Sequence, residues 1–194
     1  MEEKNLSGEE SLQLITKMIN QARNRFSETG TLYLFWGWII FICCIAVFVM
    51  LFYFNFQQAY NIWYITWLGF IYQIFYLIKK KKTQKVHTYT DEIIGFVWVT
   101  FVICVFIILY ILIKNNALAA INPCLLVLYG IPTFLSGVIL KFKALRIGGC
   151  ICWSPAIAAM FASYEYQLLL LALAIICAWI IPGYLLRAKF KKEN

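Results

Sequence analysis

The chain has 194 residues, of which 63% are hydrophobic, 18% are aromatic and only 13% carry a charged side chain. Soluble domains carry about twice that share of charged residues, so the composition excludes an ordinary water-soluble domain and indicates a membrane protein. The net charge of +8 suggests a nucleic-acid partner on first inspection. The basic residues, however, alternate with long apolar runs and are not interleaved with aromatic side chains, so no nucleic acid is expected.

Residues 1–30 are the most polar part of the chain and predict a cytoplasmic amphipathic leader helix. Apolar side chains recur there at spacings of three and four, which place them on one side of a helix. They are Leu12, Ile15, Met18, Ile19, Ala22 and Phe26. The basic residues Lys17, Arg23 and Arg25 border this stripe, so they are candidate contacts for the anionic headgroups of a lipid bilayer. The alternatives are packing of the stripe on the protein's own loops, or on a second copy in a homo-oligomer.

Six apolar runs follow the leader, and none of them contains an acidic or basic residue. They cover residues 31–54, 59–78, 93–113, 117–140, 147–162 and 167–186. A helix of about 20 apolar residues crosses the hydrocarbon layer of a bilayer, roughly 30 Å thick, at about 1.5 Å per residue. The pattern predicts an all-α polytopic integral membrane protein with six transmembrane helices in one membrane domain, residues 31–186, and a basic cytoplasmic tail, residues 187–194.

The fifth run, residues 147–162, is the shortest, because a helix of that length reaches only about 24 Å. We expect it to cross the membrane nevertheless, with the helix beginning at Lys143 and the Arg146 side chain extending to the interface. If it did not cross, the basic tail would lie outside the cell, against the positive-inside rule. A re-entrant loop is the alternative.

The lysines and arginines predict the orientation of the chain. Of the seventeen basic residues, all but Lys114 fall in the leader, in alternate loops or in the tail, and these segments lie on one side of the membrane. The sequence therefore predicts a multi-pass protein of the bacterial inner (plasma) membrane with both termini in the cytoplasm. The densest basic group follows the second span and is a further set of candidate headgroup contacts. It consists of Lys79, Lys80, Lys81, Lys82 and Lys85.

All four prolines lie in the last three spans and predict kinked or widened helices there, since each removes a backbone donor. They are Pro123, Pro132, Pro155 and Pro182. Polar residues beside them are candidates to line a cavity formed by spans four to six. These are Asn122, Thr133, Ser136 and Ser154. The alternative is that both features are ordinary ones, because proline is common in membrane helices and hydroxyl groups usually bond their own backbone.

Catalytic chemistry has little support, because the spans contain no ionisable Asp, Glu, His, Lys or Arg. The single histidine, His87, stands near Asp91 and Glu92, which are explained more simply as favourable charges at the N-terminus of the third span. The seven cysteines form no C-x-x-C pair and are expected to pack as small apolar residues. No catalytic residue, metal site or cofactor is predicted.

Two stretches of sequence resemble a group of uncharacterised six-span bacterial inner-membrane proteins. These are E-S-L-Q-L-I-T-K-M-I at residues 10–19 and Y-L-F-W-G-W at residues 33–38, so the likeness covers roughly the first forty residues. The resemblance implies a bacterial protein, sometimes encoded beside a small cytosolic winged-helix regulator. It brings no established activity and no functional residues.

Two functions follow as hypotheses. The first is a non-enzymatic membrane sensor or scaffold that presents its leader and basic loops to lipid headgroups or to a cytosolic regulatory protein. The alternative is a small transporter or channel for an uncharged or amphipathic solute, using the proline-containing spans four to six. An intramembrane enzyme comes third, because the spans lack ionisable groups.

Overall fold

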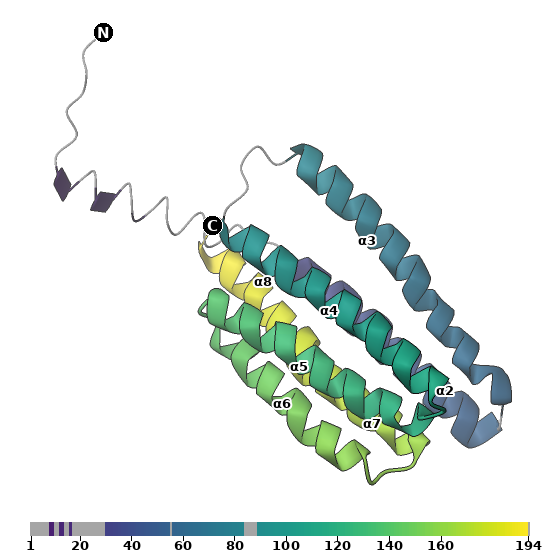
Figure 1. Ribbon diagram of the computed structural model, residues 1–194. Helices are drawn as coiled ribbons and strands as arrows, with labels where there is room; N and C mark the ends of the chain where they lie inside the picture. Colours follow the sequence, from purple (N-terminus) through teal and green to yellow (C-terminus); the bar gives the residue numbers. More distant parts are fainter. Residues whose placement is uncertain are drawn as a thin grey trace.

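The computed structural model describes residues 8–9, 12–13, 16, 30–54, 56–83 and 89–193, and all regular secondary structure within these ranges is helical (Figure 1). The all-α prediction is therefore confirmed for this part of the chain. The main helices are α2 (Gly30–Phe54), α3 (Tyr64–Thr83), α4 (Tyr89–Lys114), α5 (Ile121–Ile139), α6 (Lys143–Ala159), α7 (Tyr164–Ile175) and α8 (Ile181–Glu193). Short 3₁₀ turns, Gln57–Trp63 and Leu118–Ala120, precede α3 and α5.

Five helical segments are long and apolar enough to cross a membrane. They cover Gly30–Phe54, Gln58–Lys79, Glu92–Lys114, Leu118–Ile139 and Tyr164–Lys189. The fifth predicted span corresponds to α6, whose 17 residues reach only about 25 Å. Its helix does begin at Lys143, as expected, and it forms the most extensive helix pair of the bundle with α5. A crossing by α6 itself stays a prediction.

The last two helices are joined by a widened π-turn over Ile176–Ile180, and together they form one rod, named α7–α8. Within the turn the Ile181 amide donates to the carbonyl of Ile176, five residues earlier instead of four. Pro182 follows at once, and in a regular helix its ring would meet the carbonyl of Ala178. The widened turn removes that clash, which agrees with the effect expected of this proline. Pro123, in contrast, lies in the first turn of α5, where a missing amide leaves no bond unmade.

The core lies where α2, α5, α6 and the α7–α8 rod pack together. Its fully buried side chains include Leu126, Leu145, Leu171 and Ile175, and Ile94 of α4 packs into the same cluster. Over the most apolar 18 residues of the α7–α8 rod, 56% of the residues are buried. Over the most apolar 18 residues of α4, none is buried. Helix α4 therefore covers the bundle with one side and leaves most of its apolar surface outside.

Helix α3 stands apart from the bundle (Figure 1), and its main contacts are with α2 and with the 3₁₀ turn before it. The indole Nε1 of Trp36 donates to Oε1 of Gln73 at 2.6 Å. Gly69 lies under the Trp36 ring, where a methyl group would approach the indole to 3.3 Å. Among the described contacts, this hydrogen bond and a few aromatic contacts join the 20-residue helix to α2.

Of the leader, the structure describes Gly8, Glu9, Leu12, Gln13 and Thr16, and these five residues are helical. The Leu12 side chain is exposed. Lys17, Arg23 and Arg25 lie outside the described residues, so the amphipathic leader and its headgroup contacts stay predictions.

Candidate functional site

The four polar residues predicted to line a cavity do not come together in one place. Asn122, Thr133 and Ser136 are buried in α5, whereas Ser154 is exposed on α6 and its hydroxyl donates to the carbonyl of Ile151 at 3.2 Å. Thr133 stands eleven residues after Asn122, which separates the two by about 16 Å along the helix. They belong to two different polar clusters.

The first cluster closes the end of the bundle where α5 begins. The side-chain amide of Gln167, on α7, donates to the carbonyls of Ala119, Ala159 and Ala162 at 3.2, 3.0 and 3.2 Å. Its Oε1 accepts from Nδ2 of Asn122 at 3.2 Å. One glutamine thus contacts carbonyls in the 3₁₀ turn before α5, at the end of α6 and in the turn that follows α6. Sequence reasoning did not single out Gln167, because a polar residue at the first position of a span is ordinary.

The second cluster joins α5 to the π-turn. The indole Nε1 of Trp179 donates to Oγ1 of Thr133 at 2.8 Å, and this hydroxyl donates to the carbonyl of Tyr129 at 2.7 Å. Thr133 directly follows Pro132, so the hydrogen bond joins α5 to the α7–α8 rod at the position of this α5 proline. The sequence marks Thr133 as polar, but nothing in it names an indole 46 residues away as the partner.

An aromatic core surrounds this hydrogen bond. The rings of Tyr129 and Trp179 are 4.9 Å apart, Trp98 lies 5.9 Å from Trp179, and Tyr33 lies 5.6 Å from Trp98. Phe101 completes the core at 5.7 Å from Tyr129. These five rings come from α2, α4, α5 and the π-turn, so the aromatic core is where the elements are coupled.

Two buried hydroxyls beside the aromatic core have no hydrogen-bond partner in the described part of the chain: Tyr33 Oη and Ser136 Oγ. The Tyr33 hydroxyl lies near Ser136 and Trp98, but without the geometry of a hydrogen bond. The Nε of Arg146, on α6, is likewise buried and unpartnered. Among the described residues, these three are the buried side-chain nitrogen and oxygen atoms that have no hydrogen-bond partner.

Glycines bring α5 and α6 into backbone contact. A methyl group on Gly137 would lie 2.5 Å from the backbone nitrogen of Arg146, and one on Gly149 would lie 2.7 Å from that of Phe134. Gly130 meets the Trp153 indole in the same way. Because a side chain cannot fit at these positions, no solute fits between α5 and α6 there.

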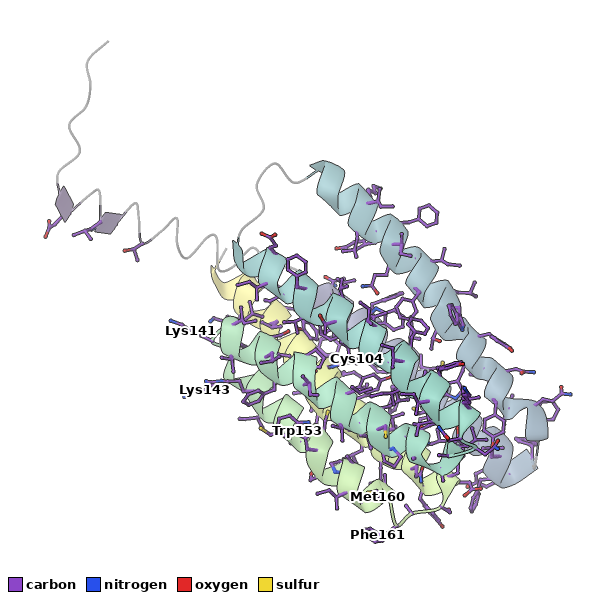
Figure 2. All side chains as sticks on the ribbon, in the orientation of Figure 1. Cys104, Lys141, Lys143, Trp153, Met160 and Phe161 are labelled. Carbon is purple, nitrogen blue, oxygen red and sulfur yellow. The ribbon has the colours of Figure 1, made fainter. Side chains whose placement is uncertain are left out.

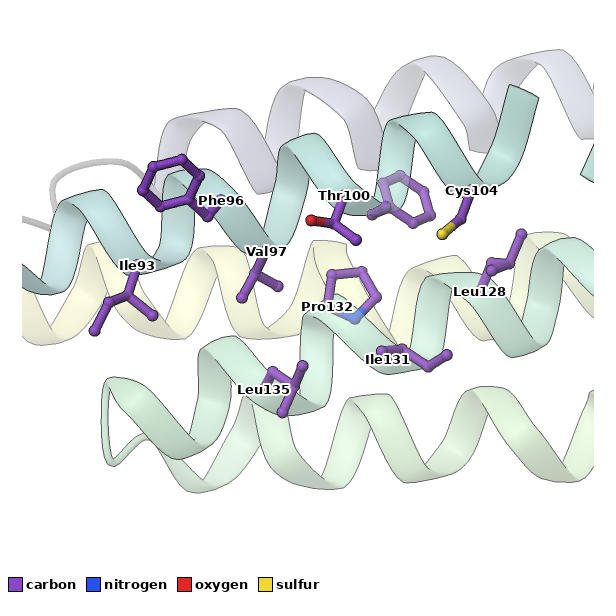
Figure 3. A pocket seen from close by; sticks show the side chains of 10 residues that line it. Ile93, Phe96, Val97, Thr100, Cys104, Leu128, Ile131, Pro132 and Leu135 are labelled. Carbon is purple, nitrogen blue, oxygen red and sulfur yellow. The ribbon is translucent and has the colours of Figure 1, made fainter. Parts of the chain in front are cut away.

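A groove of about 360 Å³ lies on the other side of α5, between α4 and α5 (Figure 3). It is lined by Ile93, Phe96, Val97, Thr100, Phe101, Cys104, Leu128, Ile131, Pro132 and Leu135. Thr100 carries the single hydroxyl of this lining, and no lining residue is charged. None of the four residues predicted to line a cavity contributes to the groove. Among its lining residues, Pro132 is the one that the sequence analysis had linked to a cavity.

Two exposed lysines lie at the same end of the bundle, Lys141 in the turn between α5 and α6 and Lys143 at the start of α6 (Figure 2). The Lys141 amide donates to the carbonyl of Val138, and the Phe142 amide to that of Gly137, which is the Schellman pattern of a helix end. Lys141 has a φ of 52°, a position that glycine adopts at a cost lower by roughly 1 kcal/mol. A charged residue therefore occupies a position where glycine would be more stable.

The headgroup contacts predicted after the second span, which do not include Lys141 and Lys143, are described only in part. Lys79 is exposed near the end of α3. Lys80, Lys81 and Lys82 continue the same helix, but their side chains, and Lys85 as a whole, lie outside the described residues. Their role at a membrane surface stays a prediction.

The described residues contain no group of three or more His, Cys, Asp and Glu side chains that could hold a metal ion. All seven cysteines are free, and Cys43, Cys44 and Cys152 are buried among apolar residues, as expected of packing residues. Comparison of the chain with protein-family models, with curated proteins and with solved structures found no match. The resemblance carried by residues 10–19 and 33–38 therefore stays a prediction.

Proposed function

We propose that this protein is a non-enzymatic, six-span protein of the bacterial inner membrane, with both termini in the cytoplasm, that acts as a cytoplasm-facing sensor or scaffold. The basic residues support the orientation, since all but Lys114 fall on one side of the six spans. Lys141 and Lys143 lie at one end of the bundle and the Met160–Phe161 turn at the other (Figure 2), as this orientation requires.

The observation that carries the proposal is the contrast between a closed interior and a loosely attached exterior. At one end of the bundle Asn122 bonds Gln167, which also bonds nearby carbonyls, and at the π-turn Trp179 bonds Thr133. In the segment Gln58–Lys79, which includes most of α3, only 6% of the most apolar 18 residues are buried. A protein arranged in this way offers its membrane-facing and cytoplasmic surfaces to partners, and not a polar interior to a substrate.

Transport through spans four to six receives less support from the packing. These spans correspond to α5, α6 and the α7–α8 rod, and Gly137 and Gly149 bring the first two into backbone contact. Gly148 likewise touches the π-turn, where a methyl group would lie 2.8 Å from the Cα of Ala178. A solute path between these helices would require them to separate.

Deletion of residues 1–30 tests the sensor or scaffold function. Membrane-embedded full-length protein and the deletion variant are purified from the native host, and the co-purifying cytosolic proteins are compared by mass spectrometry. We expect the deletion to remove partners while the remaining helices still insert. A triple Lys17→Gln, Arg23→Gln, Arg25→Gln variant should lose the same partners, and Lys114→Gln, a lysine on the opposite side, should keep them. Identical partners for all four proteins would count against a scaffold built on the leader.

A further inference from the structure

We propose that the groove between α4 and α5 binds one acyl chain of an inner-leaflet phospholipid, whose anionic headgroup meets Lys141 and Lys143. The proposal rests on the proposed function, because the predicted orientation places this end of the bundle in the cytoplasmic leaflet. It adds a defined ligand class and a defined site to a protein proposed to sense or organise the membrane.

The dimensions of the groove limit what can occupy it. The lining residues on α4 extend from Ile93 to Cys104, eleven residues or about 16 Å along the helix axis. A volume of about 360 Å³ spread over that length gives a mean cross-section of roughly 22 Å². An α-helix with its side chains is about 10–12 Å wide, or roughly 80–110 Å² in section. A whole helix therefore cannot enter the groove, whereas a single extended hydrocarbon chain can lie along it.

The walls of the groove have the chemistry that such a chain needs. Nine of the ten lining side chains carry neither a hydroxyl nor a charge, and the tenth, Thr100, lies in the middle of α4, where a hydroxyl can bond its own helix carbonyl. Pro132 is fully buried and forms part of the floor. Phe96 and Ile131, in contrast, are exposed and leave the groove open towards the outside of the bundle, where acyl chains would be.

Helix α3, the least packed segment, cannot be the occupant in the observed arrangement. It contacts α4 through Phe106, whose ring lies 5.8 Å from Trp67 and 6.4 Å from Phe70. Phe106 is six residues beyond Thr100, which places the two side chains about 120° apart around the helix. Helix α3 thus lies on a different side of α4 from the groove.

The charges at the cytoplasmic end fit a phosphate group. Leu135 is the last lining residue on α5, and Lys141 follows six residues later, about 9 Å further towards the end of the bundle. Lys141 and Lys143 are both exposed there (Figure 2). The nearest described carboxylate in sequence, Glu92, precedes Ile93 but projects about 100° around α4 from it. Positive side chains thus outnumber the described carboxylate at this end of the bundle, and an anionic headgroup is favoured over a zwitterionic one.

Photo-crosslinking tests the site directly. The full-length protein is placed in nanodiscs of phosphatidylcholine that contain a small fraction of phosphatidylglycerol with a photoactivatable acyl chain, and crosslinked peptides are mapped by mass spectrometry. We expect crosslinks to concentrate on residues 93–104 and 128–135. Thr100→Trp fills the groove and should reduce them roughly tenfold. Val99→Trp, on the adjacent exposed face of α4, should leave them unchanged.

Two further variants keep the test decisive. Ile131→Trp blocks the groove from α5, where the side chain is exposed, so it replaces Thr100→Trp if that variant does not fold. A double Lys141→Gly, Lys143→Gln variant removes both charges while glycine suits the positive φ of residue 141. It should lose the preference for photoactivatable phosphatidylglycerol over an equally labelled phosphatidylcholine.

Two results would overturn the lipid site. One is uniform crosslinking along every exposed face of α4, unaffected by either tryptophan. The other is chain-to-chain crosslinks through the groove in place of lipid adducts. Loss of leader-dependent partners is a separate measurement, so failure of the lipid site and failure of the scaffold function are distinguishable.

Discussion

Individual glycines set the spacing of the bundle. A Gly137→Ala or Gly149→Ala substitution adds a methyl group at 2.5–2.7 Å from the backbone of the facing helix, where only a shift of the whole helix can relieve the clash. We expect each to lower the free energy of unfolding by about 1–3 kcal/mol, measured in a mild detergent. Gly95→Ala is the matched control, because a methyl group there meets no atom within 4 Å. It should be neutral or stabilising by up to about 1 kcal/mol, since alanine favours a helix. Equal destabilisation by all three variants would contradict the glycine contacts.

Gln167 is the second residue whose loss should be costly. A Gln167→Leu substitution leaves the carbonyls of Ala119, Ala159 and Ala162, and the Asn122 amide, without their side-chain partner. We expect the free energy of unfolding to fall by about 2–4 kcal/mol, because buried polar groups are costly when unpaired. Ser154→Ala removes an exposed hydroxyl bonded to its own helix and should change stability by less than about 0.5 kcal/mol. A stable Gln167→Leu protein would show that water or another group satisfies these carbonyls.

The sequence could identify the types of these residues but not their partners. Asn122, Thr133 and Ser136 stand out as polar residues near prolines, and all three are buried. Asn122 and Thr133 bond residues 45 and 46 positions away, on another helix. Hydropathy and spacing contain no information on such long-range pairs. The same polar residues therefore suggested a cavity, whereas the described structure pairs two of them across helix contacts.

At the scale of the helices, α3 is the segment most easily released. Among its described contacts is the hydrogen bond from Trp36 to Gln73. A Gln73→Leu substitution removes that bond, so we expect hydrogen exchange across α3 to accelerate roughly tenfold, equivalent to about 1.4 kcal/mol of local stability. Exchange in α5 and α6 should stay unchanged. Simultaneous acceleration throughout the bundle would mean that α3 is a cooperative part of the core.

The order of the helices follows from the sequence, because polar loops separate the apolar runs. The first span was predicted as residues 31–54 and α2 covers Gly30–Phe54. Other helix ends differ by several residues from the limits of their apolar runs, as in the sixth, where the run was 167–186 and the α7–α8 rod covers 164–193. For the fifth run, 147–162, the helix was predicted to begin at Lys143, and α6 does begin there, after an extended Phe142 with a φ of −107° and a ψ of 109°. The lateral groove could not be predicted, because its walls come from α4 and α5 and depend on how these two helices pack.

At the scale of the whole molecule, the groove and the π-turn are connected through the aromatic core. Phe101 lines the groove and packs on Tyr129, which packs on Trp179 in the π-turn. We expect phosphatidylglycerol to slow hydrogen exchange in residues 176–186 of the wild type, measured in nanodiscs against phosphatidylcholine alone. The same lipid should have no such effect in Thr100→Trp. A slowing that persists in this variant would show that lipid acts on the rod by another route.

The central claim, that six helices cross the membrane with both termini in the cytoplasm, depends most on α6, the shortest of them. Phe161 is exposed in the turn after α6, and Lys141 is exposed in the turn before it (Figure 2). Phe161→Cys and Lys141→Cys are therefore expressed in bacteria and treated with a membrane-impermeant thiol reagent, with wild-type labelling as the background. We expect Phe161→Cys to be labelled when the inner membrane is intact and Lys141→Cys only after that membrane is permeabilised. Labelling of both cysteines from the same side would contradict the crossing of α6 and the six-span topology with it.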